Sequence, residues 1–131
     1  MTVEPVPTPS APPVAGPYSP AVRAGDWIVC AGQVGLDPKH GMVDGIEAQT
    51  RQVLANIKAV LGDCGCTLND VAKTTVFVTD LANFGVVNEI YGEAFGDHRP
   101  ARSTVQVAAL PAGAEVEIEV WAYSETTAQR A

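Results

Sequence analysis

Residues 115–123 read EVEIEVWAY, and this stretch decides the fold. Five small or apolar residues alternate here with five polar or aromatic ones; the first set is Ala114, Val116, Ile118, Val120 and Ala122, and the second is Glu115, Glu117, Glu119, Trp121 and Tyr123. A period of two predicts a strand with one buried face. We therefore expect helices to cover the apolar set, and the three glutamates and two aromatic rings to face away from them.

The strand before it begins in HRPARSTVQV, residues 98–107, and is joined to EVEIEVWAY across a turn at residues 110–113. Arg102, Thr104 and Gln106 alternate along this strand, and we expect them on the face that carries the glutamates. A face with one arginine, several carboxylates and large aromatic residues resembles a subunit interface with a polar pocket. The alternative is a solvated outer face, the ordinary role of such a strand.

The rest of the chain predicts further strands and two helices. Strands are expected at 21–24, 27–34, 71–79, 102–108 and 114–123, and helices at about 46–61 and 83–95. The run WIVCAGQV, residues 27–34, is apolar until Gln33, as in a strand covered on both faces. Asp44 is the expected N-cap of the first helix, with Glu47 three residues later, and Gly62 or Gly65 is expected to end it. The element order predicts an α+β fold with two helices packed on one face of a sheet.

Three segments divide the chain. Residues 1–15 contain five prolines and are expected to form an extended flexible tail outside the sheet, because proline has no N–H to donate. Residues 16–125 form the predicted domain, and residues 126–131 a short C-terminal tail.

The composition of the 131 residues argues against several classes of protein. A net charge of −7 disfavours a nucleic-acid surface, and no apolar run approaches the length of a membrane span. Cys30, Cys64 and Cys66 are read as reduced thiols of a cytoplasmic protein. His40 and His98 are isolated, so we expect no metal site. The motifs GxSxG, GxGxxG, Walker A and HExxH are absent, which argues against those enzyme classes.

Arg102 is the strongest chemical candidate, because a guanidinium binds a carboxylate bidentately and stays charged. Glutamates two residues apart repel one another, so at least one should have a raised proton affinity and could hold or deprotonate a water molecule. The alternative is a structural salt bridge between Arg102 and a glutamate. Tyr18, in GPYSP, could line a pocket or simply anchor the start of the domain. Gly32, in CAGQV, suggests either a close backbone approach or a bulge.

Five stretches together resemble the Rid (YjgF) family of enamine/imine deaminases. They are GPYSPAV (16–22), IVCAGQVGLDP (28–38), QTRQVLANIKAVL (49–61), VAKTTVFVTDLANFGVVNEIY (71–91) and RPARSTVQVAALPAGAEVEIEVWA (99–122). The resemblance covers residues 16–124. It implies a chorismate-mutase-like (bacillus-type) α+β fold, assembled as a homotrimer with active sites between subunits. It also implies hydrolysis of small imino or enamine carboxylates, such as 2-aminoacrylate, to 2-keto acids and ammonia without a cofactor.

The resemblance assigns roles to individual residues. Arg102 matches the arginine that grips the substrate carboxylate, and Glu117 matches the glutamate that positions the catalytic water, aided by a main-chain carbonyl near Thr104. Other pocket positions are matched by Tyr18, Gly32, Asn88 and Thr104. The chain departs from the family pattern at Ala31, where serine is usual, and at Thr104, where cysteine is common.

Two other functions stay open at this point. The first is a non-catalytic trimeric protein that binds small carboxylates, and the second is a specialised catabolic enamine deaminase of the aminomuconate type. A ribonuclease or translation inhibitor, activities attached to some relatives, is disfavoured by the acidic composition.

Overall fold

A computed structural model describes residues 2–125, so the expected tail at 126–131 lies outside the described residues. The strands are β1 (Val3–Pro5), β2 (Ala21–Ala24), β3 (Trp27–Cys30), β4 (Gln33–Val34), β5 (Leu36–Asp37), β6 (Gly41–Met42), β7 (Val71–Val78), β8 (Ala101–Gln106) and β9 (Val116–Tyr123). The helices are α1 (Ile46–Asp63) and α2 (Phe84–Phe95), with short 3-10 turns at Leu68–Asp70, Leu81–Asn83 and Pro111–Gly113.

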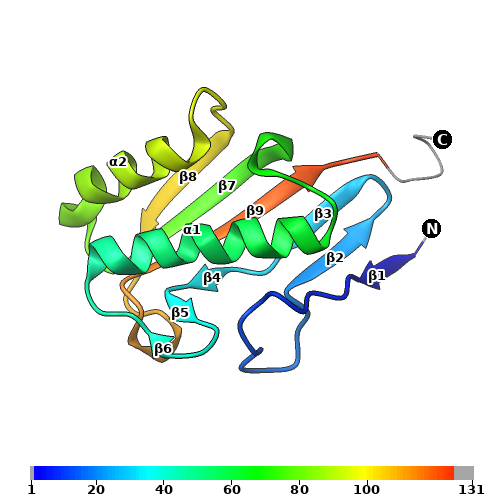
Figure 1. Ribbon diagram of the computed structural model, residues 1–131. Helices are drawn as coiled ribbons and strands as arrows, with labels where there is room; N and C mark the ends of the chain where they lie inside the picture. The colour runs from blue at the N-terminus through cyan, green and yellow to red at the C-terminus, as the bar shows by residue number, and fades with distance from the viewer. Residues whose placement is uncertain (1, 126–131) are drawn as a thin grey trace.

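Within residues 2–125, seven strands form one mixed sheet in the order β1-β2-β3-β9-β7-β8, with β4 also paired to β9. β7 and β8 run parallel, and the other neighbours in the sheet are antiparallel. A parallel pair needs a crossover connection, which α2 supplies here. Figure 1 shows α1 and α2 on the same side of the sheet. The predicted α+β class, with two helices on one face, is confirmed.

β9 runs through the middle of the sheet, and its alternation is confirmed. Val116, Ile118 and Val120 are fully buried beneath the helices. Glu115 is an exception to the predicted outer face, because its carboxylate Oε2 accepts from Gln49 Nε2 of α1 at 3.5 Å, and its backbone N–H donates to Gln49 Oε1 at 2.8 Å. It precedes the strand, which begins at Val116, so the outward ladder contains two carboxylates rather than three.

One face of α1 is buried, as an amphipathic helix requires, but the N-cap predicted at Asp44 is wrong. The N-cap is Gly45 at φ 88°, with no side-chain hydrogen bond to the first turn. The N-cap position has a positive φ, which glycine adopts more readily than aspartate, so Gly45 and not Asp44 is the N-cap. Glu47 is then two residues after the N-cap, and a capping box requires three. At the other end Gly65 has φ 77°, and Cys66 N–H donates back to Leu61 O at 2.8 Å. Gly65 rather than Gly62 therefore provides the left-handed residue that ends the helix.

The apolar run at residues 27–34 is two strands with one covered face. β3 and β4 are separated by Ala31 and Gly32, and the Trp27 side chain is 38% exposed. The prediction of cover on both faces is wrong for a single chain, because no helix within the described residues packs on the outer face.

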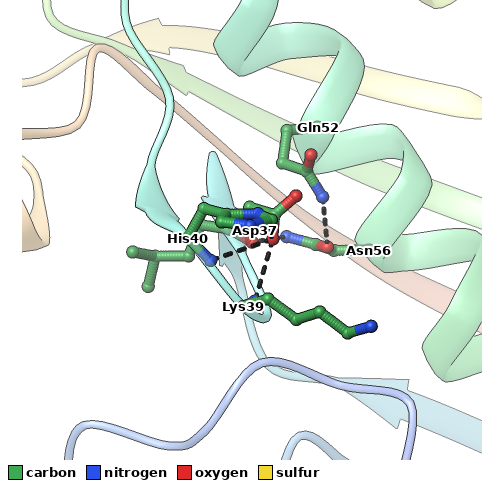
Figure 2. A network of polar contacts seen from close by, with 6 residues as sticks. Asp37, Lys39, His40, Gln52 and Asn56 are labelled. Atoms are coloured by element: carbon green, nitrogen blue, oxygen red, sulfur yellow. Dashed lines mark hydrogen bonds and ion pairs between the residues drawn. The ribbon is translucent and has the colours of Figure 1, made fainter.

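The segment that follows β4 is fixed to α1. Asn56 of α1 donates to the carbonyls of Val34 and Leu36 at 3.1 and 2.8 Å. Figure 2 shows the surrounding network. Gln52 Nε2 donates to Asn56 Oδ1 at 2.9 Å, which orients the Asn56 amide toward the chain. Asp37 Oδ1 accepts from the backbone N–H groups of Lys39 and His40, and so closes the β5–β6 turn. These two hydrogen bonds hold the pKa of the Asp37 carboxyl below its usual value, with His40 adding to the effect. The network ties the segment that follows Gly32 to the helix layer.

The proline-rich segment is not outside the sheet as predicted. Residues 3–5 form β1, which pairs antiparallel with β2 at the sheet edge. Proline is compatible with an edge strand because an edge residue can turn its N–H side away from the ladder. Ser10 donates twice to the Asp63 carboxylate at 2.9 Å, and Pro12 is buried. The segment from Val3 to Pro12 is therefore part of the folded unit.

Candidate functional site

Arg102 lies on the helix-covered face of the sheet. On β8 it is opposite Thr74 of β7, which in turn is opposite Val120 of β9. Thr74 and Val120 are fully buried beneath the helices, and residues directly opposite one another point to the same face. The Arg102 guanidinium carbon lies 4.8 Å from the centre of the Tyr91 ring and 5.6 Å from that of Phe84. Two rings of α2 therefore hold the charge in place, at about 0.5–2 kcal/mol per contact.

An open hollow of about 490 Å³ adjoins Arg102. It is lined by Asn88, Tyr91, Gly92, Arg99, Pro100 and Arg102. Within residues 2–125 no carboxylate forms an ion pair with Arg102. The alternative of a structural Arg102–glutamate salt bridge is therefore wrong for this chain, and the guanidinium is available for an anion in the hollow.

The floor of the hollow is fixed by a buried hydrogen bond. Tyr91 Oη and Thr74 Oγ1 lie 2.8 Å apart, and Thr74 is fully buried. Burial raises the pKa of the Tyr91 hydroxyl, although the bond to Thr74 and the positive charge of Arg102 act in the opposite direction. Tyr91 is therefore a neutral phenol that supports the guanidinium.

Glu117 is on the other face of the sheet. It lies opposite Phe77 of β7, between the fully buried Val116 and Ile118, and its side chain is half-buried against Gly32. A Cβ added at Gly32 would lie 2.7 Å from the Glu117 carboxyl carbon, so the close approach predicted at this glycine is confirmed. Burial, and then the negative charge of Glu119, raise the pKa of the Glu117 carboxyl. This is the raised proton affinity expected within the ladder.

The expectation that Arg102 shares a face with the glutamates is wrong. Arg102 and Glu117 lie on opposite faces of one sheet, so they cannot both contact one small molecule within a single chain. The physical reason is the register of β8 on β7, which places Arg102 beside Thr74 and turns Ser103 outward, where its hydroxyl accepts from Lys73 Nζ at 2.8 Å.

The remaining candidates divide between these two groups. Asn88, half-buried on α2, lines the hollow with Arg102. Thr104 of β8 lies opposite Val76 of β7, on the same face of the sheet as Arg102. Gly32 belongs with Glu117. Tyr18 joins neither group within the described chain: its side chain is 52% exposed, and its hydroxyl accepts from Ala15 N–H at 3.5 Å.

The thiols of Cys30 and Cys64 are poor nucleophiles. Burial is the main cause that raises the pKa of Cys30 to about 12 and that of Cys64 to about 11. Both remain protonated at neutral pH, and a thiol reacts as its thiolate. In the part of the chain that the structure describes, no group of three potential ligands could hold a metal ion. Nor is any described helix both long and apolar enough to cross a bilayer.

Sequence reasoning missed the aromatic support of Arg102. In the sequence, Phe84 and Tyr91 lie on the apolar side of the helix expected at 83–95, the pattern of core residues. Phe84 is instead 40% exposed, and both rings lie beneath the guanidinium. Their seven-residue spacing on one helix face was the available signal, but nothing in the sequence placed that face against β8.

A family model described as "Endoribonuclease L-PSP" matches residues 8–124, about nine-tenths of the chain. The chain belongs to the Rid (YjgF/L-PSP) family. Among curated Rid relatives, a RutC family protein of Pyrococcus horikoshii is 50% identical over 120 residues, covering 90% of this chain and 95% of the relative. The 2-iminobutanoate/2-iminopropanoate deaminase of Mus musculus is 47% identical over 114 residues, covering 86% of this chain and 84% of the relative.

Solved Rid structures have the same fold. The crystal structure of E. coli TdcF with bound serine superposes with a TM-score of 0.88 at 36% identity, covering 93% of this chain and 99% of that one. The resemblance noted in the sequence is thus confirmed at the level of the family, as is the α+β fold with a mixed sheet and two helices.

Proposed function

We propose that this Rid protein hydrolyses reactive 2-imino and enamine acids, of the 2-aminoacrylate type, to 2-keto acids and ammonia. The observation that carries the proposal is the state of Arg102, which lines a hollow and has no ion-pair partner within residues 2–125. The name of the mouse relative, at 47% identity, supports the same chemistry. Serine, which TdcF binds, is itself a small carboxylate.

In this proposal Arg102 binds the substrate carboxylate through two charge-assisted hydrogen bonds. Asn88 lines the same hollow, and Thr104 follows Arg102 by two residues on the same face of β8. The guanidinium is already held over two rings, so little side-chain freedom is lost when the substrate binds. The reactive imine carbon is then fixed next to the carboxylate that Arg102 holds.

Glu117 is proposed to position the attacking water. An enamine substrate first takes up a proton at its β-carbon and becomes the imine. The water oxygen forms a bond to the imine carbon, the C=N electron pair moves to nitrogen, and nitrogen takes up a proton. In the resulting carbinolamine the hydroxyl group loses its proton and nitrogen gains one, so that the C–N bond breaks, ammonia leaves and the 2-keto acid remains. Glu117 accepts the proton that the water loses, and its raised pKa makes it a better base than an exposed glutamate.

Because Arg102 and Glu117 are on opposite faces, the proposed site combines two subunits. We propose the chorismate-mutase-like homotrimer, with Arg102 of one copy meeting Glu117 of the next. The outer face supports such contact, since Trp27, Trp121 and Tyr123 form an edge-to-face cluster there with centroids 5.2–6.2 Å apart. Trp121 and Tyr123 are 45% and 46% exposed in a single chain, and exposed apolar patches of this kind mark interaction sites.

The test is a coupled assay in which an amino-acid oxidase generates 2-imino acids and semicarbazide traps those that remain. Wild type should speed imine loss, and Arg102→Ala should lose about 100-fold in kcat/KM, as for two charge-assisted hydrogen bonds. Arg51→Gln on α1 changes the net charge equally but lies outside the hollow, so it should behave as wild type. No acceleration across small, branched and aromatic imino acids would refute the proposal.

Glu117→Gln separates an enzyme from a binding protein. An amide cannot accept the water proton, so turnover should fall sharply while affinity for a 2-keto acid is retained. If wild type binds 2-keto acids tightly but turns over no imine, the chain is the non-catalytic carboxylate-binding protein instead.

A further inference from the structure

A second arginine lines the hollow that contains Arg102. Arg99 precedes β8 and is exposed, and its guanidinium donates to the carbonyl oxygens of Gly96 and His98. These acceptors are neutral, and within residues 2–125 no carboxylate forms an ion pair with Arg99. The neighbouring Asp97 is exposed and forms none with it. Two guanidinium groups without carboxylate partners therefore line one open hollow.

The local backbone explains why both side chains reach the same place. Residues three apart on a regular strand point to opposite faces. Arg99, however, lies before the first strand residue, Ala101, and Pro100 fixes the turn into the strand. The loop thus brings Arg99 round to the side that Arg102 occupies.

Tyr91, which lines the same hollow, is affected by both charges. Burial raises the pKa of its hydroxyl, while the Thr74 hydrogen bond and the positive charges of Arg102 and Arg99 act to lower it. Both guanidinium groups are thus close enough to act on one oxygen at the floor of the hollow. A single substrate carboxylate needs only one of them.

We propose that the preferred substrates are small 2-imino dicarboxylates, with Arg102 on the carboxylate next to the imine carbon and Arg99 on the distal one. This deepens the proposed function and rests on it. The chain carries a net charge of −7, which repels a dianion. A local pair of cations is the arrangement that offsets this repulsion at one site.

The experiment compares kcat/KM for imines generated in situ from alanine, leucine, aspartate and glutamate by suitable amino-acid oxidases. The variants are Arg99→Gln, the conservative Arg99→Lys, and Arg51→Gln as the charge-matched control. Arg99→Gln should raise KM for the two dicarboxylates about fivefold, the upper end for an exposed ion pair, with little change in kcat. Activity on the alanine and leucine imines should stay within about twofold, and Arg99→Lys should recover part of the loss.

A binding measurement separates this inference from the proposed function. Calorimetric titration with 2-oxoglutarate and with 2-oxobutanoate should show a preference for the dicarboxylate that Arg99→Gln removes. If no imine is hydrolysed but this preference is present, the deaminase proposal fails and takes the claim about substrates with it, while the pairing of Arg99 and Arg102 on a dicarboxylate stands. If monocarboxylate imines are hydrolysed and dicarboxylates show no advantage in rate or binding, or if Arg99→Gln weakens both classes equally, the inference is overturned alone.

Discussion

Replacing Gly32 with alanine tests the contact that fixes Glu117. An added Cβ would lie 2.7, 2.8 and 2.9 Å from the carboxyl carbon, Oε2 and Cγ of Glu117, whereas ordinary van der Waals contact begins near 3.4 Å. The Gly32 backbone is held by the strands on either side of it, so the Glu117 side chain must move. Every clashing atom belongs to that flexible side chain.

The expected effect is large on catalysis and small on stability. A shift of about 1 Å in a catalytic group costs about 100-fold in rate, so kcat should fall by about that factor. KM should change little, because Arg102 on the other face still binds the carboxylate. Moving one half-buried side chain to another rotamer costs about 1 kcal/mol, which corresponds to a few degrees in Tm for a chain of this size.

The assay is steady-state imine hydrolysis, with thermal unfolding measured on the same samples. Gly62→Ala is the matched control, because a Cβ there has no neighbour within 4 Å. Gly62 is inside α1, so alanine should leave kcat unchanged and raise stability by about 0.5–1 kcal/mol. Wild-type kcat in Gly32→Ala would show that the position of Glu117 does not matter, and would refute this account of the water-positioning group.

Three further predictions concern Glu117 and Tyr91. Burial and the charge of Glu119 raise the pKa of Glu117, so the acidic limb of the pH profile of kcat/KM should lie above the ordinary glutamate value of 4.5. Glu119→Gln should move this limb to lower pH. A limb that stays in place in this variant would contradict the effect of the Glu119 charge on Glu117. A raised folded-state pKa gives stability that is full below the unfolded pKa and lost as pH rises through the folded value. Thermal unfolding should therefore show Glu117→Gln more stable than wild type at pH 7, with the difference shrinking towards pH 4, and a pH-independent difference would be evidence against this. Finally, Tyr91→Phe leaves the buried Thr74 hydroxyl without its partner and should lower the free energy of unfolding by about 1–3 kcal/mol in urea titrations, with no loss showing that the bond is dispensable.

The parts of the fold that the sequence predicts well are those with a strong apolar period. β9 alternates between fully buried residues and polar or aromatic ones, and the buried face of α1 repeats every three or four residues. In both cases the burial of apolar surface fixes which side faces the core.

β8 lacks such a period, which is why the face of Arg102 was predicted wrongly. Its sequence ARSTVQ has no apolar alternation, and the side chains beneath α2 at Arg102 and Thr104 are polar. Which face each residue takes is set by its register on β7, a long-range pairing that the local pattern does not contain. The residue types needed for the proposed chemistry could be read from the sequence, but their division between the two faces of the sheet could not.

Local backbone conformation accounts for the other errors. Gly45 at φ 88° replaces the side-chain cap expected from Asp44, and the edge strand β1 accepts Pro5, which an interior strand would exclude. Both outcomes depend on where the neighbouring elements lie. The composition of residues 1–15 does not specify the pairing of β1 with β2, and the spacing of Asp44 and Glu47 does not specify the backbone conformation at Gly45.

The most direct test of the two-subunit site is to mix the inactive variants Arg102→Ala and Glu117→Gln and let their subunits exchange, for example by co-refolding. If each site takes Arg102 from one copy and Glu117 from another, random mixing at equal amounts restores both residues in about one quarter of the sites. We predict recovery of about a quarter of wild-type imine hydrolysis. No recovery, in a mixture shown by mass spectrometry to contain hetero-oligomers, would contradict the claim that the site joins opposite faces of two sheets.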